Sequence, residues 1–223
     1  MQRRDFLALA GAAPLWRFHT GDALRLGLVL PEDPSDPASA RGADGIQLGL
    51  EEARQTTTLL ARELLVSSAP IDLRATVVVS LAPTPPWHPL VIDARARYPR
   101  GAPEHVFRVG VEEDHPGVLW RPDLERYGAA QLNQRFRARF GYGMDENAWA
   151  GWFAIKLAVE AMLRSRQRDP VALAHWLGES DARPVFDGHK GSGLSFRSGR
   201  RLHHASLIDA EPVRETAPSD AAP

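Results

Sequence analysis

The sequence predicts an α/β fold, with a mostly parallel sheet flanked by helices. Residues 24–31 form a nearly continuous apolar run that ends at a proline, the pattern of a strand buried on both faces. A polar loop follows, and residues 42–54 then repeat apolar side chains at helical spacing. Residues 76–81 are rich in β-branched side chains and predict another strand. Buried strands separated by turns and helices are typical of parallel sheets.

Three shorter segments continue this pattern. Residues 90–94 and 106–109 are predicted strands, each bounded by proline or glycine. Residues 59–66 carry helical and strand patterns in competition, so both alternatives stay open there. Together with the first strand and helix, these segments indicate one α/β layer structure over the first half of the chain.

The second half begins with a predicted buried helix after Asp145, whose carboxylate can accept hydrogen bonds from the free amides of the first turn. Two apolar stripes run along this helix, so we expect Trp149 and Trp152 to lie in the core rather than at a ligand. Residues 169–178 predict a short helix with an aspartate cap, a proline in its first turn and a glycine at its end.

The segment that follows is predicted to be a turn and a strand pair. Residues 186–188 read as the turn. Residues 194–196 and 205–209 can pair as strands around residues 198–200. Beyond residue 211 the chain is dominated by proline, alanine, aspartate and serine, which predicts a disordered tail over residues 212–223.

Composition indicates a globular protein with no strong field of either sign. Of the 223 residues, 43% are hydrophobic and 25% charged, and the formal net charge is -1. This balance gives no global basic surface to hold nucleic acid or an anionic membrane. No segment approaches membrane-spanning length. The absence of cysteine excludes disulfides and thiolate ligands and is compatible with an oxidising compartment.

The N-terminus is similar to a twin-arginine export signal. Arg3 and Arg4 precede an apolar pair and a short, weakly hydrophobic run. A cytoplasmic N-terminus with two arginines is the alternative. We therefore expect an export signal over residues 1–22, a single α/β lobe over residues 23–211 and a periplasmic location.

Candidate binding residues lie in the loops that follow the predicted strands. In open α/β sheets, ligands bind outside the carboxyl ends of the strands. These loops are residues 31–40, 80–88, 93–97 and 110–120. Together they offer aromatic, charged and hydroxyl-bearing side chains, which suit a small planar or carboxylated molecule. The predicted ligand-binding residues are Ser80, Trp87, Asp93, Arg95 and Trp120.

Arg95 is the strongest single candidate in this set. It closely follows a buried strand, and an arginine there can form two parallel hydrogen bonds with a carboxylate. A solvated surface charge, or a salt bridge to Asp93, is the alternative role. Thr84 and His88 lie in the same loops without a specific assignment.

Neither metal binding nor catalysis is indicated, and we expect no cofactor and no enzymatic activity. His203 and His204 are adjacent, and adjacent residues on a strand point to opposite faces, so this pair does not suit one metal ion. There is no Gly-x-Ser-x-Gly motif for a nucleophile. His189 and Lys190 lie between glycines, where a structural turn is favoured over a substrate contact.

Several motifs of the second half resemble one protein family. They are residues 120–141, residues 149–152 with the sequence Trp-Ala-Gly-Trp, and residues 186–191 leading into residues 194–197. They resemble the substrate-binding proteins of ABC transporters encoded with PQQ-dependent alcohol dehydrogenase systems. The resemblance covers most of residues 120–209 and, more loosely, residues 24–54 and 93–96.

This resemblance implies a type I periplasmic-binding fold and a role tied to quinoprotein alcohol oxidation. In two-lobed relatives, a second α/β lobe would follow residues 106–109. Here only residues 110–119 intervene before the matching segment, enough for a loop but not for a lobe. The expectation is therefore one lobe of that fold, with most of the second lobe missing.

Two functional hypotheses follow. The first is an exported solute-binding lobe that holds a small carboxylated molecule, such as PQQ or a metabolite of alcohol oxidation, and serves an ABC permease. The second is an interaction module that docks on a quinoprotein dehydrogenase, a cytochrome or another copy of itself as a homodimer. The resemblance favours the first, and the missing lobe, which leaves one side of a ligand exposed, favours the second.

Overall fold

The computed structural model describes residues 23–31, 35–68, 74–83, 87–101, 105–179, 184–197 and 200–203. The predicted export signal and the predicted tail both lie outside these residues, as does the segment 205–209. In the described part of the chain, none of the helices has the length and apolar character needed to cross a lipid bilayer.

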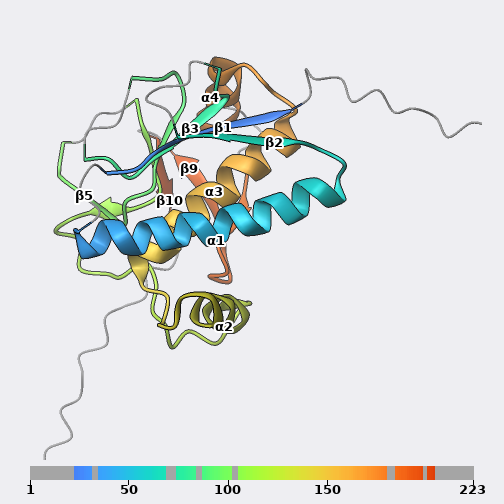
Figure 1. Cartoon of the computed structure of the whole chain (residues 1–223). Helices are drawn as coiled ribbons and strands as arrows, with labels where there is room; N and C mark the ends of the chain where they lie inside the picture. Colours follow the sequence, from blue (N-terminus) through green and yellow to red (C-terminus); the bar gives the residue numbers. More distant parts are fainter. Residues whose placement is uncertain are drawn as a thin grey trace, which may run out of the picture.

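Four helices and ten strands make up the described fold (Figure 1). The helices are α1 (Pro37–Leu59), α2 (Ala129–Phe140), α3 (Glu146–Ser165) and α4 (Pro170–Gly178). The strands are β1 (Leu24–Val29), β2 (Leu64–Ser67), β3 (Val77–Ser80), β4 (Val91–Asp93), β5 (Arg97–Tyr98), β6 (Phe107–Arg108), β7 (Val111–Glu112), β8 (Phe186–Asp187), β9 (Gly193–Arg197) and β10 (Arg201–His203).

Eight of the strands form one mostly parallel sheet in the order β2-β1-β3-β4-β6-β10-β9-β8. The pairs from β2 to β10 are all parallel, and β9 and β8 close the sheet with antiparallel pairs. Strands β5 and β7 form a separate parallel pair. The predicted mixed α/β fold with a mostly parallel sheet is confirmed.

One face of the sheet carries the main core. Alternate residues of the central strands, among them Val79, Ile92 and Phe107, are fully buried against the helices. Helix α3 supplies the largest side chains, and Trp149 and Trp152 are both buried, as the two apolar stripes predict. The opposite face carries a smaller apolar cluster, formed by Ala75, Val78, Val91 and Val106 with Val29 packed against it.

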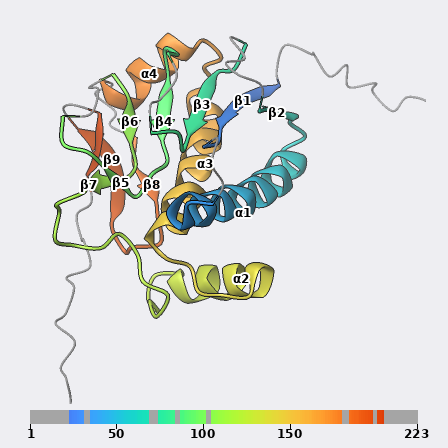
Figure 2. The same ribbon diagram turned by 60° about the vertical axis from the view of Figure 1, so that its left-hand side comes forward.

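Helices α1 and α3 lie side by side across the sheet (Figures 1 and 2). They run in the same direction, because Gly45 faces Ala148 and Gly49 faces Ile155 further along. The absence of side chains at the α1 glycines lets the two backbones approach closely. Helix α2 lies outside this pair and is tied to α1 by the ion pair between Arg135 and Glu52.

The helix caps follow the predicted chemistry. The Asp145 carboxylate accepts a hydrogen bond of 2.9 Å from the backbone amide of Ala148 at the start of α3. Asp169 does the same for Ala172 in α4, at 2.8 Å. Helix α1 begins earlier than the predicted segment, with Asp36 as its cap.

Two predictions for the C-terminal segment are corrected. Residues Phe186 and Asp187, predicted as a turn, form strand β8 because they pair with the start of β9. Strand β9 has its antiparallel partner in β10, which begins at Arg201 rather than at residue 205. The segment 110–119 holds only strand β7 and loops, which agrees with the expected short connection.

Candidate functional site

A cluster of polar side chains lies at the carboxyl ends of three adjacent strands of the parallel sheet. Ser80, Asp93 and Arg108 are the last residues of β3, β4 and β6, and they are register partners across the sheet. Register partners in neighbouring strands point to the same face. These residues therefore form one row across the sheet. The row lies on the face that carries the smaller apolar cluster, at the carboxyl ends of the strands. Together with Arg95 we call them the strand-end cluster.

Asp93 and Arg95 form a two-pronged ion pair in this cluster. The Asp93 carboxylate accepts from Arg95 Nε at 3.0 Å, from Arg95 Nη2 at 2.7 Å and from the Arg95 backbone amide at 3.0 Å. Asp93 is almost fully buried, whereas 18% of the Arg95 side chain is exposed. Burial acts to lower the pKa of Arg95, but hydrogen bonding and charge from Asp93, with the charge of Glu113, raise it overall.

Arg108 is the residue that sequence reasoning missed. It is only 1% exposed, and its Nη2 has no hydrogen-bond partner in the described structure. Burial lowers the pKa of Arg108, and the neighbouring Tyr98 and Asp93 counteract part of that effect. Its guanidinium lies over the Tyr98 ring, 5.2 Å from the centroid. A signal for it existed, because a charged residue interrupts the apolar run of residues 106–109.

Ser80 completes the row. It is fully buried, and its hydroxyl accepts a hydrogen bond of 3.2 Å from the backbone amide of Ala82. Its carbonyl accepts from the amide of Ala94 at 2.8 Å, which ties the ends of β3 and β4 together. The structure thus brings Ser80, Asp93 and Arg95 together, as three of the five predicted site residues.

Trp87 lies apart from this group. Its neighbour His88 is buried and hydrogen-bonds through Nδ1 with Leu90 and through Nε2 with the carbonyl of Ala75. Ala75 and Leu90 precede β3 and β4, so this part of the loop lies at the edge of the sheet opposite the strand-end cluster. The Trp87 side chain itself is 75% exposed. Thr84 lies outside the described residues.

Trp120 lies in the core instead of a crevice. It is 2% exposed, and its Nε1 donates to Asn133 Oδ1 at 2.8 Å. Its ring stacks on Trp149 with 6.0 Å between the ring centroids. With its polar group and its ring face both engaged, Trp120 fixes the segment before α2 against α3.

Arg97 holds the neighbouring loop in place. It donates to the Glu146 carboxylate at 2.9 Å and to the carbonyls of His115 and Gly117 at 2.8 and 2.9 Å. Glu146 also accepts from the backbone amide of Leu119. These bonds clamp the loop after β7 to the start of α3, at the same edge of the sheet as the strand-end cluster.

The chemistry of the strand-end cluster suits an anion. The cluster itself holds two arginines and one aspartate, with exposed Glu113 as an acidic group outside it that acts on Arg95. Arginine matches the planar geometry of a carboxylate. Within the described residues, no group of three or more His, Cys, Asp or Glu side chains has the arrangement of a metal site. Of the adjacent histidines His203 and His204, only His203 lies within the described residues, so the prediction that they point to opposite faces stays untested.

Comparisons with known proteins give distant structural likenesses. No protein-family model matches the chain, and no curated protein matches it. An extracellular ligand-binding receptor from Desulfohalobium retbaense DSM5692 is 12% identical, with a TM-score of 0.47, over 79% of this chain and 56% of the other.

Two further solved structures cover slightly more of this chain. An amino acid ABC transporter substrate-binding protein from Pseudomonas fluorescens Pf-5 is 13% identical, with a TM-score of 0.32 over 82% of this chain and 52% of the other. A branched chain amino acid ABC transporter periplasmic ligand-binding protein from Burkholderia xenovorans LB400 is 16% identical, with a TM-score of 0.33 and the same coverage. The chain spans about half the length of these structures, and values of this size do not assign it to a family.

Proposed function

We propose that the chain is a periplasmic solute-binding lobe that holds a small carboxylated molecule at the strand-end cluster, without catalysing a reaction on it. The observation that carries this proposal is the buried Arg108, whose Nη2 lacks a hydrogen-bond partner beside the Asp93–Arg95 pair. A buried guanidinium nitrogen without an acceptor is costly. A ligand carboxylate held by Arg95 above it would balance the positive charge that the buried Arg108 contributes.

The position of the cluster in the sheet supports a binding role. Chain order and strand order diverge at β1, because β2 lies on one side of it and β3 on the other. In open α/β sheets, ligands bind outside the carboxyl ends of the strands near such a switch point. Ser80 ends β3 at this point, and Asp93 and Arg108 end the next two strands.

Arg95 provides the part of the cluster that a ligand can reach. The Nε and Nη2 atoms of Arg95 donate to Asp93, which leaves Arg95 Nη1 for a second carboxylate. The Asp93 bonds also fix the plane of the guanidinium, so less side-chain freedom is lost when a ligand binds. Arg108 then contributes charge from beneath and Arg95 contributes the direct contact.

A single lobe leaves one side of its ligand in water, so we expect affinity in the range of about 10–100 μM. The sequence resemblance selects PQQ and metabolites of alcohol oxidation as the first ligands to test. An ABC permease or a quinoprotein dehydrogenase would supply the second wall under the same proposal.

Equilibrium dialysis against PQQ tests this proposal. Wild-type protein should bind saturably, and Arg95→Ala should weaken binding by about tenfold or more because it removes a charge-assisted contact. Arg100→Ala is the matched control, since Arg100 is 76% exposed and lies outside the cluster. No binding at about 100 μM would remove PQQ as the ligand, and equal losses in both variants would remove the cluster as the site.

A second candidate function rests on Trp87. A tryptophan with 75% of its side chain exposed is a typical anchor of a protein interface. We infer that this edge of the sheet, opposite the strand-end cluster, docks on a partner protein, with a second copy of the chain as the first partner to test. Such an interaction module would need no ligand at Arg95.

Light scattering over a range of concentrations separates the two candidates. Self-association through Trp87 predicts an apparent mass that rises with concentration in the wild type and stays monomeric in Trp87→Ser. Tyr127→Ser is the matched control, because Tyr127 is also exposed, at 63%, and is remote in sequence from Trp87. A mass that is independent of concentration in all three proteins would contradict self-association through this edge.

A further inference from the structure

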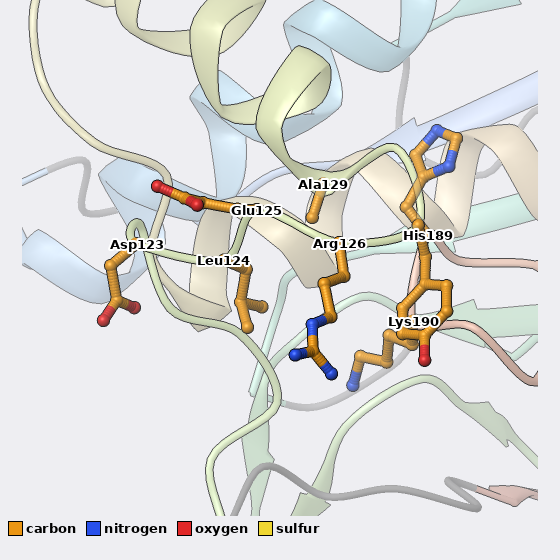
Figure 3. Close-up of a pocket in the computed structure, with 8 residues that line it drawn as sticks. Asp123, Leu124, Glu125, Arg126, Ala129, His189 and Lys190 are labelled. Carbon is orange, nitrogen blue, oxygen red and sulfur yellow. The ribbon is translucent and has the colours of Figure 1, made fainter.

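A cavity of about 410 Å³ lies away from the strand-end cluster, between the segment that leads into α2 and the turn between β8 and β9 (Figure 3). Leu124, Arg126 and Ala129 contribute from the first side, and His189 and Lys190 from the turn. Its volume lies within the range of small-molecule sites. None of the four strand-end residues lines it.

Lys190 is an unusual residue at the wall of this cavity. Its side chain is 9% exposed, and its Nζ has no hydrogen-bond partner within the described structure. The ammonium lies 4.1 Å from the centroid of the Trp149 ring. Trp149 is held in turn by a hydrogen bond of 3.1 Å from its Nε1 to the carbonyl of Gly188. Lys190 is thus buried on an aromatic face without an acceptor.

The acidic group that acts on Lys190 is Glu146, and its carboxylate already accepts hydrogen bonds from other residues. Among the residues that the structure describes, Glu146 is the charged group that favours the protonated form of Lys190. Both Glu146 oxygens, however, accept hydrogen bonds from Arg97, and one of them also accepts from the amide of Leu119. Burial lowers the pKa of Lys190 to about 7, and Glu146 offsets only part of this effect. A buried amine in this state lacks a counter-charge.

Acidic and basic side chains lie in different parts of the cavity lining. Figure 3 shows the Arg126 guanidinium and the Lys190 amino group directed to the same end, with the carboxylates of Asp123 and Glu125 at the other. His189 adds little positive charge, since burial lowers its pKa. In this view both basic groups lie away from the acidic end of the cavity.

We propose that this cavity is a second binding site, for a small monocarboxylate whose carboxylate lies between Lys190 and Arg126 and whose apolar body packs on Leu124 and Ala129. The ligand supplies the missing acceptor and counter-charge. Because the amino group is covered in the free protein, binding requires the flexible Lys190 side chain to swing from the Trp149 ring toward Arg126. The acidic end disfavours ligands with several negative charges.

The chain offers a direct test, because Lys156 and Lys190 are its only lysines. NMR of full-length protein with isotope-labelled lysine should give two side-chain signals. Benzoate is the probe and benzamide its neutral counterpart. Benzoate should shift the Lys190 signal saturably, reduce the ring-current effect of Trp149 on it and raise its apparent pKa. Lys156 is the internal control, since it is paired with Glu160 at 2.9 Å and should not respond.

Variants then locate the contact. Arg126→Ala should weaken the benzoate response of the Lys190 signal by about tenfold, the loss of one charge-assisted bond. Arg137→Ala is the matched control, an exposed arginine of α2 that does not line this cavity. The Lys190 signal reports on this cavity, whereas dialysis against PQQ reports on the strand-end cluster, so failure here and failure there are distinguishable.

Three results would overturn the proposal itself, and a fourth would contradict the geometry on which it rests. The first is a Lys190 signal that does not respond to benzoate, and the second is an equal response to benzamide, which would mean that the carboxylate is not recognised. The third is a tighter response to inorganic phosphate than to benzoate, which would replace the carboxylate by a different anion. A Lys190 signal that titrates with an ordinary pKa in the free protein would contradict the buried geometry itself.

Discussion

Gly45 in α1 and Ala148 in α3 are packed backbone to backbone. A β-carbon added at Gly45 would lie 1.9 Å from the carbonyl oxygen of Ala148. The same helix pair is close again where a β-carbon at Gly151 would lie 2.2 Å from the carbonyl oxygen of Gly42. The α1–α3 contact therefore depends on missing side chains, and it fixes where the start of α3 lies relative to the sheet.

Gly45→Ala should destabilise the protein by more than about 2 kcal/mol, because backbone atoms cannot move aside as a flexible side chain can. Without this contact, replacing glycine by alanine inside a helix stabilises by about 0.5–1 kcal/mol. The sign of the change is thus diagnostic. Urea unfolding measures it, with exposed Gln47→Ala as a control on the same helix. A gain in stability for Gly45→Ala would contradict the close approach.

The start of α3 also depends on its cap. Asp145→Ala removes the acceptor for the Ala148 amide and should lower the free energy of unfolding by about 1 kcal/mol. Asp145→Ser keeps an acceptor in place and should recover most of this loss. Thermal unfolding of both variants provides the measurement. Equal losses for alanine and serine would show that the cap bond contributes nothing.

Local patterns account for the elements that could be predicted. Strands β1, β3 and β4 carry apolar runs, and α3 and α4 carry both a helical period and a capping aspartate. Each of these signals lies within one short stretch of chain. The parallel sheet follows from them because buried strands of this kind need cover on both faces.

Helix α2 shows why other elements escaped prediction. It begins after Gly128, which offers no side-chain cap, and it buries only Ala129, Leu132, Asn133 and Phe136. Its apolar stripe is therefore narrow, and no start signal marks it. Strands β5, β7 and β8 have two residues each, too few for a period of two to be visible.

The candidate site was only partly predictable for a different reason. Ser80, Asp93 and Arg95 follow obvious strands, so the rule for strand ends finds them. Whether an aromatic residue lines a crevice or the core depends on distant partners, as the bond from Trp120 to Asn133 shows. Arg108 belongs to the candidate site because it is the register partner of Asp93 in the neighbouring strand. This register cannot be predicted from the sequence of either strand alone.

Asp93→Ala should be strongly destabilising. It removes the buried counter-charge of Arg108 and Arg95 and leaves exposed Glu113 as an acidic group that acts on Arg95, and breaking a buried pair in this way costs about 3–5 kcal/mol. Asp114→Ala is the matched control, because the Arg100–Asp114 pair is exposed and its loss should cost less than about 1 kcal/mol. Urea unfolding of both variants gives the comparison. Similar small losses would contradict a buried role for Asp93.

Lys190 makes stability depend on pH in a defined direction. Its pKa is about 7 in the folded protein, against an ordinary value of 10.5. Between these values the unfolded chain binds a proton that the folded protein lacks, so the free energy of unfolding rises with pH. Below pH 7 both states are protonated, and the folded state carries the buried charge at a constant cost.

Lys190→Met removes this titration and should therefore stabilise the protein at pH 7, by an amount of the order of a few kcal/mol. The advantage over the wild type should shrink steadily as pH rises toward 10, because the wild-type lysine becomes neutral in both states. Urea unfolding of the two proteins at several pH values isolates the effect, since all other groups are shared. Lys156→Met is the control for the loss of a lysine side chain outside this cavity. A pH-independent difference between Lys190→Met and the wild type would show that Lys190 titrates normally and finds a partner or solvent in the folded protein.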